Sequence, residues 1–402
     1  MSYKMLDGNA AAVEAICLAD VKVISAYPIT PQSSIAEKLS SLVEDGTLKA
    51  EYIRVESEHT AMSAATTAQL TGVRAATATS SVGLALMHEI LGLTAGLRVP
   101  IVMPVVNRAL VAPWSLWCEH GDTMAERDTG WMQFYTQNVQ DIVDLMLVAY
   151  KVSETAEVLL PSMVCLDGFF LSHSMQKVDV PDIDTVRAFL GSYTAKNTFL
   201  DASNPMFIND LTGPDEFTEM RYQQKEGFKK ALAVIPSVMK EFEKTFGRKL
   251  SMIEEYKSKD ADVVIVALGS MCGTIKQVVN DMRKSGKKVG LVRITTFRPF
   301  PMALMQKALA DKKAIGVFDR SAGLGSEGGP VWNEVRSALY GTEGQILPFI
   351  GGLGGRDIPP ATIEKVFAKL LDTAAQGKKT RDNTWIDVKN NPMEMREVLL
   401  DV

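Results

Sequence analysis

The sequence predicts an α/β fold with two domains built on largely parallel sheets. Its 402 residues exceed the length of one ordinary domain. In the first half, short β-rich runs alternate with helical patterns, which is typical of βα units. A second alternation of this kind begins at residue 263, after a long charged segment. We therefore expect a larger domain at residues 1–240, a smaller one at 241–372 and a C-terminal arm at 373–402.

The first domain is expected to contain strands and helices in alternation. Strands are predicted at residues 21–26, 52–56, 74–79, 101–106 and 159–166. Helices are predicted at residues 32–44, 58–70, 83–96 and 139–155, after an alanine-rich helix near the N-terminus. Proline, aspartate and asparagine interrupt residues 178–214, so we expect an irregular segment there.

The second half repeats this pattern on a smaller scale. The charged run at 216–259 predicts a connecting helix, and the apolar run at 263–268 is typical of a strand buried on both faces. Further strands are predicted at residues 289–293, 314–318 and 346–350. The polar tail after residue 376, which contains Trp385, is expected to be a surface arm.

The composition argues against several classes of partner. The net charge of −5 and the lack of a basic, aromatic-interleaved stripe argue against nucleic acid. No apolar run approaches the roughly 18 residues of a membrane span, and the N-terminus lacks a signal segment, so we expect a cytoplasmic protein. The cysteines and histidines are scattered without a metal-binding spacing, which predicts that this chain ligates no metal.

Polar side chains follow three of the predicted strands, where ligands bind in parallel α/β sheets. They are Thr30, Glu58 and Arg108. Each also has a structural explanation: Thr30 before Pro31 is a good helix N-cap, and Glu58 suits the first turn of a helix. Arg108 could form a structural salt bridge. The residue pattern alone leaves a functional and a structural interpretation open for all three.

These turns resemble motifs of the 2-oxoacid:ferredoxin oxidoreductases. Residues 27–33 (YPITPQS) resemble the YPITP motif, residues 56–61 (ESEHTA) the segment with the thiamine-activating glutamate, and residues 106–110 (VNRAL) the segment with the substrate arginine. Further similar stretches lie at residues 126–131, 165–173 and 296–301. The resemblance runs from about Asp7 to Leu371 and is greatest to the alpha subunit of the pyruvate-type enzyme.

The resemblance implies a pyrimidine-type thiamine-diphosphate-binding domain, followed by a smaller domain like the transketolase C-terminal domain. Glu58 would hydrogen-bond the N1′ atom of the cofactor's aminopyrimidine, and Tyr27 and Pro28 would lie close to the cofactor. Thr30 and Arg108 would bind the 2-oxoacid, with Arg108 on its carboxylate. Glu58, Thr30 and Arg108 are thus the expected catalytic residues.

The implied reaction is oxidative decarboxylation of pyruvate with coenzyme A to acetyl-CoA and CO2, with transfer of the electrons to ferredoxin. The same chemistry on 2-oxoisovalerate, 2-oxoglutarate or oxalate is an alternative. A non-catalytic scaffold subunit is another, although the presence of Thr30, Glu58 and Arg108 argues against it.

The chain lacks the G-D-G motif that binds magnesium and diphosphate in thiamine enzymes. Gly121-Asp122-Thr123 lacks the second glycine of that motif, and Leu166-Asp167-Gly168 lacks the first. The resemblance therefore implies that a beta subunit supplies Mg2+ and a 4Fe-4S cluster. Gamma and delta subunits, separate or fused, would carry further clusters.

Glycine-rich segments in the second domain offer further alternatives. Residues 323–328 fit G-x-G-x-x-G and would suit an NAD-dependent dehydrogenase, but they lie late in the domain and lack a well-placed acidic partner. Gly269, Ser270 and Gly273 could bind an anion at a helix N-terminus, although a serine-capped turn is favoured. Residues 351–355 are predicted to form a flexible loop.

Overall fold

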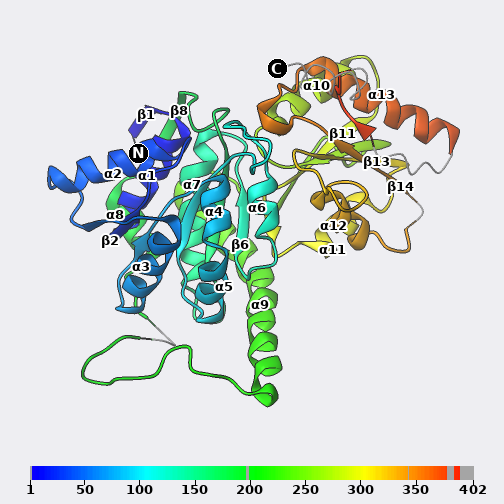
Figure 1. Cartoon of the computed structure of the whole chain (residues 1–402). Coiled ribbons are helices and arrows are strands. Elements are labelled where there is room, and N and C mark those ends of the chain that lie inside the picture. Colours follow the sequence, from blue (N-terminus) through cyan, green and yellow to red (C-terminus); the bar gives the residue numbers. More distant parts are fainter. Residues whose placement is uncertain (1, 196–198, 343, 378–383, 390–402) are drawn as a thin grey trace, which may run out of the picture.

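The computed structural model describes residues 2–195, 199–342, 344–377 and 384–389, which form two lobes (Figure 1). The first lobe, blue to green in the figure, contains the sheet that carries the predicted site residues. The second, yellow to red, contains a separate sheet. The predicted α/β class, with a larger and a smaller parallel-sheet unit, is confirmed. The domain boundaries at residues 240 and 372 remain predictions.

The sheet of the first lobe consists of two groups of strands joined by one parallel bridge between Thr79 and Val105. The first group has the order β3 (Glu51–Arg54), β2 (Val23–Ala26), β4 (Ala75–Ala76). The second has the order β12 (Thr296–Arg298), β6 (Met132–Tyr135), β7 (Ser162–Asp167), β5 (Val102–Asn107). All pairs are parallel except β12 with β6, so a strand from the second half closes one edge of the first sheet.

Helices cover both faces of this sheet, so β5 is buried on both sides. Val102 and Val106 pack into one core, and the alternate residues Met103 and Val105 pack into another. The first core contains residues of α1 (Gly8–Leu18), α2 (Ser33–Glu44), α7 (Val139–Ser153), α8 (Ile183–Leu190) and α9 (Pro214–Phe246). The second contains residues of α3 (Glu58–Leu70), α4 (Ser81–Leu86), α5 (His88–Gly96) and α6 (Gly121–Ala125). Two strands far apart in the sequence, β1 (Ser2–Leu6) and β8 (Gln176–Val180), form a separate antiparallel two-stranded sheet.

The second sheet has the order β15 (Thr384–Trp385), β14 (Gln345–Ile350), β13 (Ala314–Asp319), β10 (Val263–Ala267), β11 (Val289–Ile294), β9 (Ile253–Tyr256). Only β9 runs antiparallel to its neighbour among these described strands. One face packs against α10 (Met271–Lys284) and α13 (Pro360–Gln376). The other packs against α11 (Met302–Leu309) and α12 (Pro330–Ala338), within the core that also contains α3. A short 3-10 turn, η1 (Leu353–Gly355), follows β14.

The structure corrects several predicted elements. The single helix expected at residues 83–96 is two helices, α4 and α5, which meet at Met87. The segment predicted to be irregular contains α8, which begins because the Asp182 carboxylate accepts the backbone N–H of Thr185 at 2.9 Å. The long connector ends at Phe246, because Gly247 takes a left-handed conformation there. Strand β9 then occupies the last part of the expected helix, and β6 was not predicted.

The predicted C-terminal arm begins inside α13, and Trp385 pairs with β14 as part of β15. Residues 378–383 and 390–402 of that arm lie outside the described residues. Among the helices that the structure describes, none has the length and hydropathy needed to cross a membrane.

Candidate active site at the carboxyl ends of the first sheet

The three predicted site residues follow strands of one sheet. Strands β2, β3 and β5 end at Ala26, Arg54 and Asn107, and Thr30, Glu58 and Arg108 come shortly after these ends. Because the strands are parallel, their carboxyl ends lie on the same edge of the sheet. Glu58 and Arg108 are 6% and 5% exposed, whereas Thr30 is exposed.

Glu58 is the first residue of α3, after Ser57, whose side chain caps the helix by accepting the N–H of Thr60 at 3.2 Å. Its carboxyl group packs against the backbone of α4. A Cβ atom at Gly83 would lie 2.4 Å from Glu58 Oε1 and 2.6 Å from Thr79 Oγ1. Glycine at position 83 therefore creates the space into which the Glu58 carboxyl and the Thr79 hydroxyl both fit.

The Glu58 carboxyl has unused hydrogen-bonding capacity. Burial raises its pKa, and a hydrogen bond from its own backbone N–H partly offsets this. Among the described residues, no other side chain bonds to it, and the Thr79 hydroxyl is likewise buried without a partner. Buried polar groups are normally satisfied, so this pair has the properties expected where a ligand completes the hydrogen bonding.

Arg108 is a buried cation that has no acidic partner among the residues that the structure describes. Its Nη1 donates to the Thr30 backbone oxygen at 2.8 Å, and its Nε donates to the Ser115 backbone oxygen at 3.3 Å. Within the described part of the chain it forms no ion pair, so the salt-bridge interpretation is wrong. Burial lowers its pKa, and the nearby Asp122 carboxylate opposes that effect. A guanidinium in this state favours an anionic ligand.

Thr30 lies beside Arg108, because the Thr30 carbonyl accepts the hydrogen bond from the Arg108 guanidinium. Thr30 itself is exposed. The interpretation of Thr30 as a helix N-cap is wrong, because α2 begins at Ser33 and Gln32 occupies the capping position. Tyr27 and Pro28 lie on the same loop and are also exposed. Their predicted position beside a cofactor remains a prediction.

Asp122, a residue that sequence reasoning did not assign to the site, connects its parts. Its Oδ2 atom accepts the backbone N–H groups of Ser81, at the start of α4, and Arg108, at 3.0 and 2.9 Å. Its Oδ1 atom accepts the Asn107 amide and the Thr123 N–H, both at 2.8 Å. This carboxylate, part of the nearest approach to G-D-G, therefore points into the protein and not toward a bound cation.

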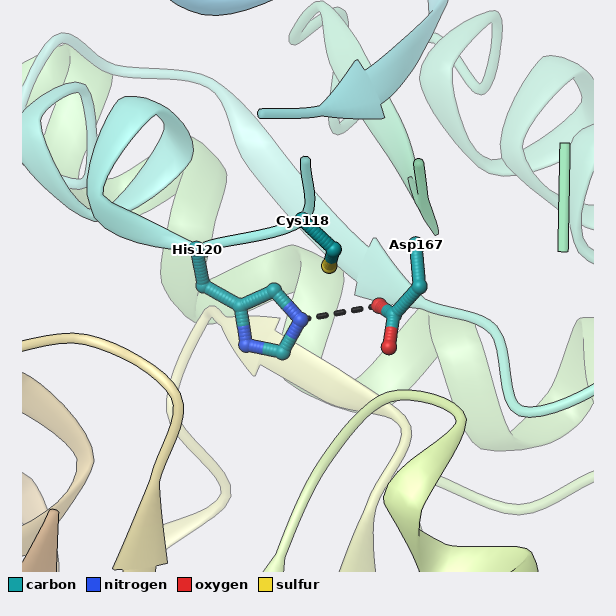
Figure 2. A group of neighbouring side chains, drawn as sticks. All are labelled: Cys118, His120 and Asp167. Atoms are coloured by element: carbon teal, nitrogen blue, oxygen red, sulfur yellow. Dashed lines mark hydrogen bonds and ion pairs between the residues drawn. The ribbon is translucent and has the colours of Figure 1, made fainter. Parts of the chain in front are cut away.

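A second buried cluster lies close by, where Cys118, His120 and Asp167 point toward one another (Figure 2). These residue types can bind metal, but the Asp167 carboxylate already has cationic and neutral donors. His120 Nε2 lies 2.8 Å from its Oδ1, and Arg320 Nη1 lies 2.9 Å from its Oδ2. Although burial raises the pKa of Asp167, His120, Arg320 and Ser270 together hold it below its usual range. Because a second cation beside Arg320 would be repelled, we assign the cluster to packing between the lobes.

Internal carboxylates also occupy the two glycine-rich helix starts. At α10, the Ser270 N–H donates to Asp167 Oδ2 at 3.0 Å, so the anion at this turn is the chain's own. At α12, Asp319 accepts the N–H groups of Val331 and Trp332 at 2.9 and 3.2 Å. A dinucleotide phosphate would have to displace Asp319, which argues against the dehydrogenase alternative.

The loop at residues 351–355 contacts the first lobe. The Gly355 N–H donates to the Cys118 carbonyl at 2.8 Å, and a Cβ atom at Gly355 would lie 2.3 Å from Trp117 Cβ. The loop that follows Arg108 is therefore supported from the second lobe.

Comparison with known proteins gives two family matches. The family model described as pyruvate flavodoxin/ferredoxin oxidoreductase, thiamine diphosphate-binding, matches residues 14–240. The model for the pyruvate:ferredoxin oxidoreductase core domain II matches residues 261–363.

Three similar proteins span nearly the same length as this chain. The pyruvate synthase subunit PorA of Methanothermobacter thermautotrophicus is 45% identical over 97% of this chain and 99% of its own length. The corresponding subunit of Methanocaldococcus jannaschii is 48% identical over 96% of this chain and 98% of its own. The ketoisovalerate oxidoreductase subunit VorA of Pyrococcus horikoshii is 41% identical, again over 96% and 98%.

Two solved structures share the fold. The 2-oxoglutarate:ferredoxin oxidoreductase of Magnetococcus marinus aligns with a TM-score of 0.72 at 19% identity over 92% of this chain. This chain spans 65% of the length of that protein. A split-gene transketolase in an inactive beta4 form aligns with a TM-score of 0.50 at 13% identity, over 93% of this chain and 98% of its own.

Proposed function

Because this chain belongs to the pyruvate flavodoxin/ferredoxin oxidoreductase family, we propose that it is the alpha subunit of a pyruvate:ferredoxin oxidoreductase. The complete enzyme oxidatively decarboxylates pyruvate with coenzyme A to acetyl-CoA and CO2, reversibly, and passes the electrons to ferredoxin. One observation carries the residue assignment. Among the described residues, the buried Glu58 carboxyl has no side-chain partner and the buried Arg108 cation has no acidic partner, and both residues follow strands that end at the same edge of the sheet.

The residues present fit thiamine diphosphate. The cofactor's aminopyrimidine needs a carboxyl group that can share a proton with a ring nitrogen, and Glu58 has that capacity free. The missing Cβ at Gly83 leaves the space beside this carboxyl, and the Thr79 hydroxyl, which has no partner in the described part of the chain, adds a second polar contact. Tyr27 and Pro28 would border the cofactor from the loop after β2.

Thiamine diphosphate, when bound, supplies the carbon nucleophile that attacks the 2-oxo group. Glu58 would hold a proton at the N1′ atom of the pyrimidine, and burial, which raises the pKa of this carboxyl, favours its protonated form. Arg108 would hold the substrate carboxylate and so orient the 2-oxo carbon. The exposed Thr30 hydroxyl would donate a hydrogen bond to the substrate, next to the carbonyl that already binds Arg108.

Partner subunits would complete the site. The sequence contains no G-D-G motif, and both near matches, at Asp122 and Asp167, are engaged inside the fold. A beta subunit would supply the ligands of Mg2+ and of a proximal 4Fe-4S cluster, and gamma and delta subunits would carry further clusters. The relatives are named as subunits, which supports an enzyme of several chains.

A branched-chain substrate is the second candidate, because a ketoisovalerate oxidoreductase subunit is 41% identical over nearly the whole chain. The test is a substrate panel on the intact complex, purified with its partners. With coenzyme A, we expect pyruvate to reduce a low-potential dye faster than 2-oxoisovalerate, 2-oxoglutarate or oxalate. Turnover of another of these acids but not pyruvate would show that the substrate assignment is wrong.

A further inference from the structure

The Asp122 carboxylate lies between the two functional parts of the proposed site. One of its oxygens accepts backbone N–H groups from both Arg108 and Ser81. Asp122 is only 1% exposed. We propose that Asp122 is a positioning residue. It holds the substrate-binding Arg108 at a fixed position relative to the part of α4 against which Glu58 packs. This inference rests on the proposed function.

The contact to Arg108 is made to its backbone and not to its guanidinium. Asp122 thus places a negative charge near Arg108, which opposes the fall in the pKa of Arg108 caused by burial, and it leaves the side chain free for a ligand. An aspartate that paired with the guanidinium itself would compete with a substrate carboxylate. The geometry therefore stabilises a buried cation without neutralising its binding face.

Through its contact to Ser81, Asp122 also affects the position of the surface against which Glu58 packs. The Ser81 hydroxyl donates to the Ala109 carbonyl at 2.5 Å, and the Ser80 hydroxyl donates to the Val106 carbonyl. The start of α4 is therefore tied to both sides of Arg108, with Asp122 bonded to both segments. Gly83, two residues after Ser81, forms the surface against which the Glu58 carboxyl rests. A shift of Ser81 would move this surface.

The orientation of Asp122 is fixed by its other oxygen. The Asn107 amide and the Thr123 N–H each donate to Oδ1 at 2.8 Å. Burial raises the pKa of Asp122, and these hydrogen bonds to its charged form act in the opposite direction. Four donors on one buried carboxylate match what an ionised group needs in order to remain inside a protein.

The test is Asp122→Asn in the intact complex, with Asp319→Asn as the matched control. Asp319 is also buried and also accepts two backbone N–H groups at a helix start, but it ends β13 in the second lobe, and its donors are at the start of α12. We expect Asp122→Asn to raise the KM for pyruvate on the order of 10- to 100-fold, because small displacements of a positioning group have effects of this size. Titration calorimetry should also show weaker thiamine diphosphate binding. Asp319→Asn should change the melting temperature and leave the KM and the cofactor affinity unchanged.

Two further variants make the test specific. In the double variant Asp122→Asn/Arg108→Ala, the KM should match that of Arg108→Ala within about twofold. Asp122 acts on the KM by positioning the Arg108 side chain, so its effect should disappear once that side chain is removed. If Asp122→Asn does not fold, Asn107→Ser removes one of the donors to Asp122 and should raise the KM roughly threefold or more.

An Asp122→Asn complex with lowered thermal stability but an unchanged KM and cofactor affinity would overturn the inference, as would full additivity with Arg108→Ala. If Asp122→Asn does not fold and Asn107→Ser is tested in its place, an unchanged KM in Asn107→Ser would also overturn the inference. Failure of the proposed function would give a different result. The wild-type complex itself would then bind no thiamine diphosphate and turn over none of the four 2-oxoacids.

Discussion

Arg320 Nη1 lies 2.9 Å from Asp167 Oδ2, and both side chains are almost completely buried where the two lobes meet. Asp167 ends β7, in register with Asn107 at the end of β5, so the ion pair lies next to the segment that carries Arg108. His120 binds the other oxygen of the same carboxylate. The edge of the first sheet that carries the proposed site is therefore attached to the second lobe by a buried carboxylate.

We predict that Arg320→Met lowers the free energy of unfolding by about 3–5 kcal/mol, because it leaves the buried Asp167 carboxylate without its arginine partner. Lys284→Met, which removes the exposed pair with Asp281, should leave the free energy of unfolding nearly unchanged, because solvent screens exposed ion pairs. Urea denaturation followed by circular dichroism measures both. Equal losses in the two variants would contradict a stabilising role for the Asp167–Arg320 pair.

Gly83→Ala should impair cofactor binding far more than Gly92→Ala. A Cβ atom at Gly83 would lie 2.4 Å from Glu58 Oε1, whereas a Cβ atom at Gly92 would meet no atom within 4 Å. The Glu58 carboxyl would have to move, so we expect thiamine diphosphate affinity to fall roughly tenfold or more. Calorimetric titration of both variants provides the comparison. Wild-type affinity in Gly83→Ala would mean that the Glu58 carboxyl does not rest at this position in the working enzyme.

Arg108→Ala should reduce kcat/KM for pyruvate by about 100-fold, since a charged hydrogen-bonding partner of the substrate is lost. Arg108→Lys keeps the charge but loses the fork of donors, so we expect it to recover only part of the activity. Arg54, which ends β3 at the same edge and is exposed, provides the control Arg54→Ala. If Arg108→Ala retained the wild-type KM for the 2-oxoacid, the proposed contact with the carboxylate would be wrong.

The sequence predicted the elements whose signals are local. Helix α3 begins at Glu58 because Ser57 caps it, and β10 was visible as an uninterrupted apolar run. Short elements were missed where tertiary contacts define them. Strand β6 has only four residues and is held between β7 and β12, of which β12 comes from more than 150 residues later in the chain.

Part of the candidate site was also predictable, because some of its residues have local signals in the sequence. Thr30, Glu58 and Arg108 follow strands and carry recognisable motifs, and the structure places Thr30 and Arg108 in direct contact. Gly83 and Asp122 have no such signal. Their importance depends on which atoms approach them from distant parts of the chain, such as Glu58 at Gly83 and Ser81 at Asp122, and spacing in the sequence does not encode that proximity.

The pH dependence of stability should change in Asp319→Asn. Burial raises the pKa of Asp319 to about 7, whereas an aspartate in an unfolded chain titrates near pH 4. The folded state therefore binds this proton more tightly, and the stability that the group contributes below about pH 4 is lost as the pH rises through about 7. Asparagine cannot ionise, so the stability of the variant relative to wild type should rise between pH 5 and pH 8. A relative stability that stays constant over this range in urea denaturation would contradict the raised pKa.

Glu58→Gln should slow turnover roughly 100-fold or more while leaving the assembled complex intact, because the amide cannot share a proton with the cofactor's pyrimidine. The fold should tolerate the change, since no other side chain among the described residues bonds to the Glu58 carboxyl. Its exposed neighbour Glu56, which accepts a hydrogen bond from the Thr60 hydroxyl at 2.5 Å, provides the control Glu56→Gln. Steady-state kcat should fall only in Glu58→Gln, and melting temperatures should stay close to wild type in both. A Glu58→Gln complex that turned over pyruvate at the wild-type rate would remove Glu58 from the proposed mechanism, and its burial would then have only a packing role.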